Sequence, residues 1–221
     1  MKKLISLKNS IVFLYHAIRL LLIPSKSLHS LLFIGNKLSE SKLAKIAVDD
    51  LMENPAIEEQ VNFNYGYSKL DLDALKSLPK DSFGYTLFEF MDSQNLDVYP
   101  LLENEKPSSS IYLRERRRKI HDYLHLALGY GTDLHGEAEV NAFTARQTGM
   151  PICYLIVMGI LLKTMVKQPM EFHSLIKRLN RAWKMGGRCE NLFVFQWETV
   201  LEHPLEEVRL NFKRMNVNIY A

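Results

Sequence analysis

The sequence predicts an all-α protein, folded as a single mainly helical domain over residues 1–221. Apolar residues recur at the three- and four-residue spacing of amphipathic helices along the chain. Serine, aspartate, proline and glycine stand where such segments begin or end. No segment shows the alternation of apolar and polar residues that is typical of strands. These observations together favour helices packed around one core, which a chain of this length is able to bury.

Composition narrows the class of protein. Hydrophobic residues make up 47% and charged residues 24% of the chain, a balance typical of globular domains. The net charge of +3, without a groove-reading motif, argues against nucleic acid as a partner. Cys153 and Cys189 form no paired motif, which predicts a reducing, cytoplasmic setting. No targeting segment is expected, and the apolar runs are shorter than the roughly 20 residues of a spanning helix.

Residues 1–35 form an apolar N-terminal segment. A helix is expected over residues 11–23, because Ser10 is a suitable N-cap and Pro24 follows its end. Its wide apolar surface predicts a core helix or a homodimer contact. The alternative is an interfacial helix that makes the protein peripheral to a membrane. In that case the cations that meet anionic lipid are Lys2, Lys3, Lys8 and Arg19.

The next elements are short. A helix capped by Ser39 or Ser41 is expected to run through Asn54 and to end at Pro55, and residues 56–68 are expected to form a loop. A short helix capped by Ser68 or Asp71 is expected to run through Leu78, and another is expected over residues 83–91. A surface loop rich in serine and proline follows at residues 100–110.

Six longer or later helices complete the expected fold. They cover residues 110–128, 137–147, 152–162, 169–185, 191–201 and 204–215. Gly129, Gly131 and Gly136 are expected to separate the first two. The third is apolar on all sides, which predicts a central buried helix or the wall of an apolar tunnel.

A metal site is the strongest functional signal. His121 and His125 are four residues apart, so on a helix they lie on one face, with Asp122 on its flank. Glu137 follows a glycine-rich turn that is able to bring it back toward the histidines. Two imidazoles and two carboxylates suit zinc first, with magnesium, manganese or iron(II) as alternatives. A solvated helix face is the competing interpretation.

Two arginines extend this face. Arg114 and Arg118 lie seven and three residues before His121, on the ligand side of the helix. Guanidinium groups bind phosphate and carboxylate in a bidentate manner, so both are candidate substrate-binding residues. Arg116 and Lys119 are expected to point to solvent.

On the partner helix, Asn141 and Thr144 follow Glu137 at helical spacing. They are candidate substrate-binding groups, or simply polar residues on a helix surface. No residue is assigned a catalytic role from the sequence.

The pattern His121-Asp122-x-x-His125, eleven residues and then Glu137 resembles the hallmark of the coenzyme Q (ubiquinone) biosynthesis protein four family. The resemblance spans roughly residues 60 to 215. Three flanking segments also resemble the family, and they are Leu78-Pro79 to Gly84, Gln147 to Pro151, and Trp197-Glu198 to Pro204-Leu205.

This resemblance implies a role in prenylated-quinone synthesis at a membrane surface, together with other quinone-biosynthesis enzymes. It implies that a metal-dependent lyase removes the ring carboxylate of a polyprenyl-hydroxybenzoate, coupled to oxidation at that carbon. Arg114 or Arg118 would hold the carboxylate, and an apolar tunnel would hold the isoprenoid lipid. The alternative is a non-catalytic scaffold that binds the prenyl lipid for partner enzymes. A helical metallohydrolase ranks third.

Overall fold

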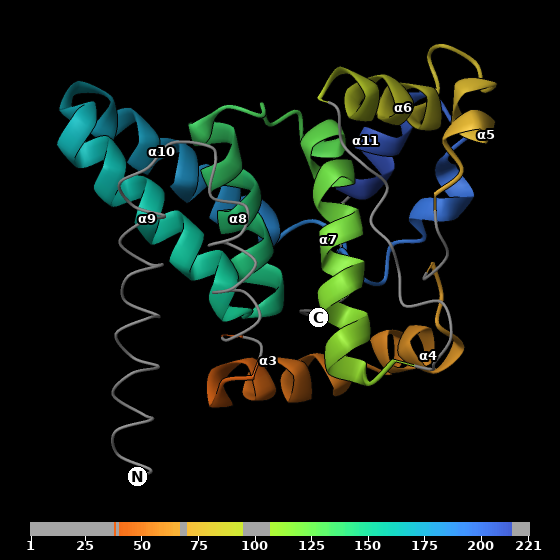
Figure 1. The fold of residues 1–221 in the computed structure, drawn as a ribbon, viewed down its shortest axis with the longest axis horizontal. Helices are drawn as coiled ribbons and strands as arrows, with labels where there is room; N and C mark the ends of the chain where they lie inside the picture. Colours follow the sequence, from red (N-terminus) through yellow and green to blue (C-terminus); the bar gives the residue numbers. More distant parts are fainter. Residues whose placement is uncertain (1–37, 39, 67–69, 95–106, 214–221) are drawn as a thin grey trace, which may run out of the picture.

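The computed structural model describes residues 38, 40–66, 70–94 and 107–213, which fold into helices joined by short connections (Figure 1). In this described part, extended pairing is limited to an isolated antiparallel bridge between Ser82 and Pro204. The all-α prediction is therefore confirmed. The helix expected over residues 11–23 lies outside the described residues.

The described helices follow one another closely along the chain. Their bounds are α3 (Lys42–Met52), α4 (Pro55–Phe63), α5 (Leu72–Lys76), α6 (Phe83–Ser93), α7 (Ser109–Leu128), α8 (Leu134–Thr148), α9 (Pro151–Lys167), α10 (Pro169–Gly186), the 3-10 helix η1 (Trp197–Val200) and α11 (Leu205–Lys213). Most match the segments expected from periodicity and capping.

Two expectations about local structure were wrong. Residues 56–68 contain α4, because Asn54 caps a new helix and Pro55 occupies its first position, where no backbone N–H is required. Residues 191–201 form turns and the short η1 instead of a regular helix. The indole of Trp197 donates to the carbonyl of Leu192 at 2.8 Å, which fixes this compact turn.

Helix α7 stands at the centre of the arrangement (Figure 1). Helices α8, α9 and α10 pack on one another to one side of it, and α5, α6 and α11 lie on the other. The main core joins α7 to both sides through fully buried residues such as Leu113, Phe143 and Trp197. A smaller core fills the space between α8, α9 and α10 around Leu175 and Ile160. The hairpin of α7 and α8 is thus held by packing on both flanks.

Helix α9 is not the central buried helix that its composition suggested. It packs against α8 and α10 through one face only, which buries Cys153, Ile160 and Thr164. Its opposite face exposes large apolar side chains, namely Tyr154 (42%), Met158 (59%), Leu162 (45%), Met165 (49%) and Val166 (74%). The all-round apolar composition of α9 therefore combines a core stripe with an exposed apolar stripe.

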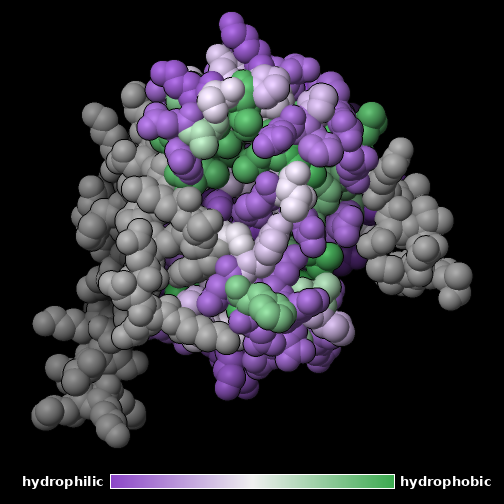
Figure 2. Space-filling view, turned by 90° about the vertical axis from the view of Figure 1, so that its right-hand side faces the viewer, coloured by the Kyte–Doolittle hydropathy of each residue, from purple (hydrophilic) through white to green (hydrophobic). Residues whose placement is uncertain are grey.

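Other parts of the surface look different. On the side turned away from α9 and α10, hydrophilic residues cover most of the described surface, with hydrophobic residues scattered among them (Figure 2). None of the described helices is both long enough and apolar enough to cross a bilayer.

Candidate metal centre

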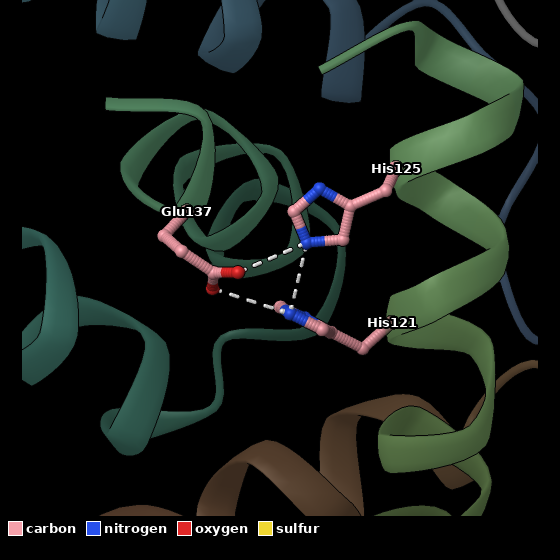
Figure 3. Close-up of side chains that lie close together, drawn as sticks. All are labelled: His121, His125 and Glu137. Atoms are coloured by element: carbon pink, nitrogen blue, oxygen red, sulfur yellow. Dashed lines mark hydrogen bonds and ion pairs between the residues drawn. The ribbon is translucent and has the colours of Figure 1, made fainter. Parts of the chain in front are cut away.

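Helix α7 places His121 and His125 on the side that faces α8 (Figure 3). The Ser108 hydroxyl accepts a hydrogen bond from the backbone N–H of Ile111 and caps the helix start. Gly129 ends the helix in the left-handed region, at φ 73°, where a side chain would be strained. The chain then turns back, so that α8 returns alongside the last turns of α7.

The first turn of α8 brings Glu137 to the histidines. Asp133 caps this helix, because its carboxylate accepts a hydrogen bond from the N–H of Gly136 at 2.6 Å. Gly136 thus lies inside α8 and does not separate the helices as the sequence suggested. Its lack of a side chain is required, since a Cβ atom would lie 1.9 Å from the carbonyl oxygen of Gly131. This close approach directs Glu137 toward α7.

The three side chains converge at one point (Figure 3). The two imidazole Nε2 atoms are 3.2 Å apart. Glu137 places one carboxylate oxygen 3.3 Å from Nε2 of His121 and the other 3.2 Å from Nε2 of His125. Ligand atoms about 2.0–2.2 Å from a tetrahedral zinc ion lie roughly 3.3–3.6 Å from one another. These residues therefore fit a divalent ion held between them.

The ring of His125 is held firmly. Its side chain is buried, and its Nδ1 lies 3.1 Å from the carbonyl oxygen of Tyr130. A carbonyl only accepts, so Nδ1 carries a proton, and the neutral form of the ring presents the Nε2 lone pair to the site. Phe90 of α6 stacks on the same ring, with centroids 5.8 Å apart. The sequence did not indicate that Phe90 or Tyr130 contacts His125, although Tyr130 follows directly after the helix-ending Gly129.

Electrostatics favour a positive charge between the two rings and Glu137. Burial would raise the pKa of Glu137, but hydrogen bonds from His121 and His125 outweigh it and lower this pKa to about 2. Burial would lower the pKa of His125, but the hydrogen bond to Glu137 outweighs it and raises this pKa. Glu137 is thus an anion at neutral pH, and a cation between the rings would replace the proton that His125 attracts.

Asp122 is placed differently from the other three candidate ligands. Its carboxylate does not belong to the group of ligand atoms that lie within 4.8 Å of one another. The residue is 8% exposed, and this burial raises its pKa, against the lowering influence of both histidines. Among the residues that the structure describes, the converging set is His121, His125 and Glu137, and Asp122 stays a prediction as fourth ligand.

Arg114 and Arg118 both form ion pairs with Glu115. Nε of Arg114 and Nη1 of Arg118 each lie 3.0 Å from a carboxylate oxygen of Glu115. The two arginine side chains remain about 30% exposed. Their role as an anion seat stays a prediction, and Glu115 offsets part of the charge that this role requires.

The expectation that Arg116 and Lys119 point to solvent was wrong. The Arg116 side chain is fully buried and lies between α7 and η1, where Glu198 binds both of its terminal nitrogens. Nζ of Lys119 lies 3.1 Å from the same carboxylate and 3.0 Å from the carbonyl oxygen of Gly66. An acidic partner 79 to 82 residues away in sequence is invisible to helical spacing.

Asn141 and Thr144 lie on α8 and are each 2% exposed. The amide of Asn141 donates to the carbonyl of Glu137 at 2.9 Å, and the hydroxyl of Thr144 donates to the carbonyl of Val140 at 2.8 Å. Both bonds lie within the helix itself. Asn141 and Thr144 are thus buried polar residues and not surface residues. Their contact with a substrate stays a prediction.

A surface cavity of about 540 Å³ lies beside the site, between α6 and Leu126. Phe90, which stacks on His125, forms part of its wall. Its other lining residues are Thr86, Glu89, Asp92, Ser93 and Leu126. The apolar tunnel expected from the sequence stays a prediction.

The comparison with known families decides where the chain belongs. The family model described as Coenzyme Q (ubiquinone) biosynthesis protein Coq4 matches residues 49–218. The chain belongs to the Coq4 family. The match includes the converging residues on α7 and α8 as well as the Arg116–Glu198 pair.

Curated Coq4 homologues from animals agree. The mitochondrial COQ4 homologue of Anopheles gambiae is 30% identical over 174 residues, which cover 77% of this chain and 57% of that protein. The Bos taurus homologue, also named mitochondrial, is 28% identical over 82% of this chain and 69% of its own length. For the first few relatives, the chain spans little more than half of their length.

A crystal structure of a Nostoc punctiforme protein, assigned to ubiquinone biosynthesis, has the same fold. The TM-score is 0.78 at 22% identity, and the alignment covers 93% of this chain and 98% of the other. At this level of identity the likeness supports the fold alone.

Proposed function

We propose that this chain holds a divalent metal ion, zinc first, and acts on a prenylated precursor in ubiquinone biosynthesis. The observation that carries the proposal is the convergence of His121, His125 and Glu137, whose ligand atoms are separated by 3.2 to 3.3 Å. Magnesium, manganese and iron(II) are weaker candidates, because two imidazole nitrogens in a compact group favour zinc. Membership of the Coq4 family supplies the pathway.

The reaction that we propose is loss of the ring carboxylate of a polyprenyl-hydroxybenzoate. The bond between the ring and the carboxylate carbon breaks and carbon dioxide leaves. In the simple form a proton takes the place of the carboxylate on the ring carbon. In the oxidative form water supplies a hydroxyl group there, and dioxygen accepts the two electrons and is reduced to hydrogen peroxide. A bound metal supplies Lewis acidity toward the ring oxygens or the carboxylate. The chain itself fixes the His125 tautomer through Tyr130 and keeps Glu137 ionised.

The test combines metal content with turnover. Purified wild type should contain about one metal ion per chain by elemental mass spectrometry and release labelled carbon dioxide from a carboxyl-labelled prenyl-hydroxybenzoate. His121→Ala and Glu137→Gln should lose most of both. The matched control is His203→Ala, which removes a histidine from an exposed pair with Glu207 on the protein surface. Full metal occupancy in the first two variants would show that the metal lies elsewhere.

The exposed apolar face of α9 favours a membrane surface as a partner. Tyr154 on α9 lies against Trp183 on α10, with ring centroids 6.3 Å apart, so the apolar surface continues across both helices. The same two helices carry exposed or half-exposed lysines, namely Lys163, Lys167, Lys177 and Lys184. Apolar side chains with aromatic residues, and lysines on the same helices, match the interface of an anionic bilayer.

The same face keeps a second function open, namely a non-catalytic scaffold. Such a scaffold would bind the isoprenoid lipid, dock on the membrane and present the lipid to other quinone-biosynthesis enzymes. Labelled carbon dioxide separates the two, because a scaffold binds the prenylated acid without releasing it. A homodimer through α9 would cover the same apolar stripe, and analytical ultracentrifugation with and without vesicles distinguishes it from membrane docking.

A further inference from the structure

Arg117 stands apart from the other cations on α7. Between residues 114 and 119, every other cation has a carboxylate partner, with Arg114 and Arg118 on Glu115 and both Arg116 and Lys119 on Glu198. Within the described part of the chain, no carboxylate lies within 4.0 Å of Arg117. Four of these five cations thus share two glutamates as partners. Arg117, in the middle of the five, pairs with neither glutamate.

Arg117 is half-buried on α7. Its Nε is buried and has no hydrogen-bond partner. The guanidinium lies beside the thiol of Cys153, which is fully buried in the first turn of α9. Burial raises the pKa of this thiol, against the lowering influence of Arg117, so the thiol stays neutral and supplies no countercharge. A buried donor on an unpaired cation is costly unless something binds it.

Position on the helix connects this cation to the metal centre. Arg117 precedes His121 by four residues, so both side chains share one face of α7, one turn or about 5–6 Å apart. Arg117 also faces the start of α9, where its guanidinium interacts with the neutral thiol of Cys153. A ligand whose anionic group meets Arg117 would therefore reach the metal-binding residues over a single helical turn.

We infer that Arg117 is the residue that binds the anionic group, a carboxylate or phosphate, of the ligand that reaches the metal centre. The inference rests on the proposed function and assigns the anion seat to Arg117 in place of Arg114 and Arg118. Guanidinium suits both anions because its paired N–H donors match two oxygens at once. The unpartnered Nε is one of these donors.

The experiment compares an acid with its neutral ester. The probes are 3-geranyl-4-hydroxybenzoate and its methyl ester, and binding to the metal-loaded full chain is measured by isothermal titration calorimetry at pH 7.5. Arg117→Gln should weaken binding of the acid about 10- to 100-fold, the range for a lost charged hydrogen-bonded pair. Binding of the ester should change less than about 3-fold, and Arg117→Lys should recover part of the affinity for the acid.

Arg114→Gln is the matched comparison, since Arg114 is already paired with Glu115. Its affinity for the acid should stay within about 3-fold of wild type. The melting temperature of ligand-free Arg117→Gln should change little, because no ion pair is broken and only the contact with the Cys153 thiol is lost. A structural role for Arg117 would lower it.

Each outcome separates this inference from the proposed function. If Arg117→Gln keeps its metal, binds the ester and binds the acid like wild type, Arg117 is not the seat, although the proposed function stands. If wild type binds neither probe, both ideas fail. Inorganic phosphate serves as a further probe: if it stabilises wild type but not Arg117→Gln, a free oxyanion suffices. If only the prenylated acid stabilises wild type but not Arg117→Gln, the lipid tail is required for binding.

Discussion

Arg116 and Glu198 form an ion pair inside the protein although 82 residues separate them in sequence. Nη2 of the arginine lies 2.8 Å from Oε2 of the glutamate, and the second nitrogen binds the other oxygen. The backbone carbonyl of Gly66 accepts from the same guanidinium at 3.4 Å. One buried cation thereby joins the middle of α7 to η1 and to the end of the α4 region.

Breaking this pair should destabilise the protein strongly. Glu198→Gln leaves the Arg116 guanidinium buried without a countercharge, which costs about 3–5 kcal/mol. Urea denaturation followed by circular dichroism measures the loss. Glu206→Gln is the control, because its pair with Arg209 is exposed and contributes less than about 1 kcal/mol. Equal effects of the two substitutions would contradict the role of the buried pair.

The same pair gives a pH dependence of defined sign. Burial would raise the pKa of Glu198, but the hydrogen bond from Arg116 outweighs it and lowers this pKa below its ordinary value of 4.5. A carboxylate with a lowered folded-state pKa adds stability above the unfolded-state pKa, and this stability is lost as the pH falls. The difference in unfolding free energy between wild type and Glu198→Gln should therefore be constant above pH 5. It should shrink below about pH 4.5. Urea titrations at intervals from pH 7 to pH 3.5 check this.

The close approach at the α8 start predicts a sharp contrast between two glycines. Gly136→Ala would place its Cβ against the backbone of Gly131, so the first turn of α8 must shift. We expect a loss of about 1–3 kcal/mol in unfolding free energy. Zinc affinity should fall as well, because Glu137 moves with that turn. Gly131→Ala meets its nearest atom at 3.7 Å, an ordinary contact, and should keep its metal.

Asp122 has its own test as a ligand. If the carboxylate completes the shell when the ion binds, Asp122→Asn should weaken zinc binding about 10- to 100-fold. Competition with a fluorescent chelator measures this affinity. Unchanged affinity would restrict the protein ligands to His121, His125 and Glu137.

The apolar face of α9 predicts vesicle binding. Met158→Glu places a charge in the middle of this face, on a residue that is 59% exposed. Sedimentation with anionic vesicles should fall at least about fivefold, since the charge must enter the interface. Leu210→Glu is the control, because Leu210 is 66% exposed on α11, on another part of the surface. An equal fall in both variants would point to a general charge effect.

Local signals predicted most of the helices, because caps and periodicity act within one or two turns. Pro55 was predicted only to end a helix and to lead into a loop. In the structure it follows one helix and is also the first residue of the next. For Arg116, the decisive partner is distant in sequence, so helical spacing gave the wrong direction. At the metal centre, spacing found the three converging residues. It missed Arg117, although the four-residue interval to His121 was visible, because only the structure shows that its neighbours are already paired.

The residues that we propose as metal ligands all come from one helical hairpin, within the 17 residues from His121 to Glu137. Contacts between residues so near in sequence form early when a chain folds, because little loop entropy is lost in closing them. The hairpin is thus able to assemble around an ion before α9, α10 and α11 have packed against it. Metal supply during synthesis would then influence how much of the protein reaches its folded state, well before any substrate is met.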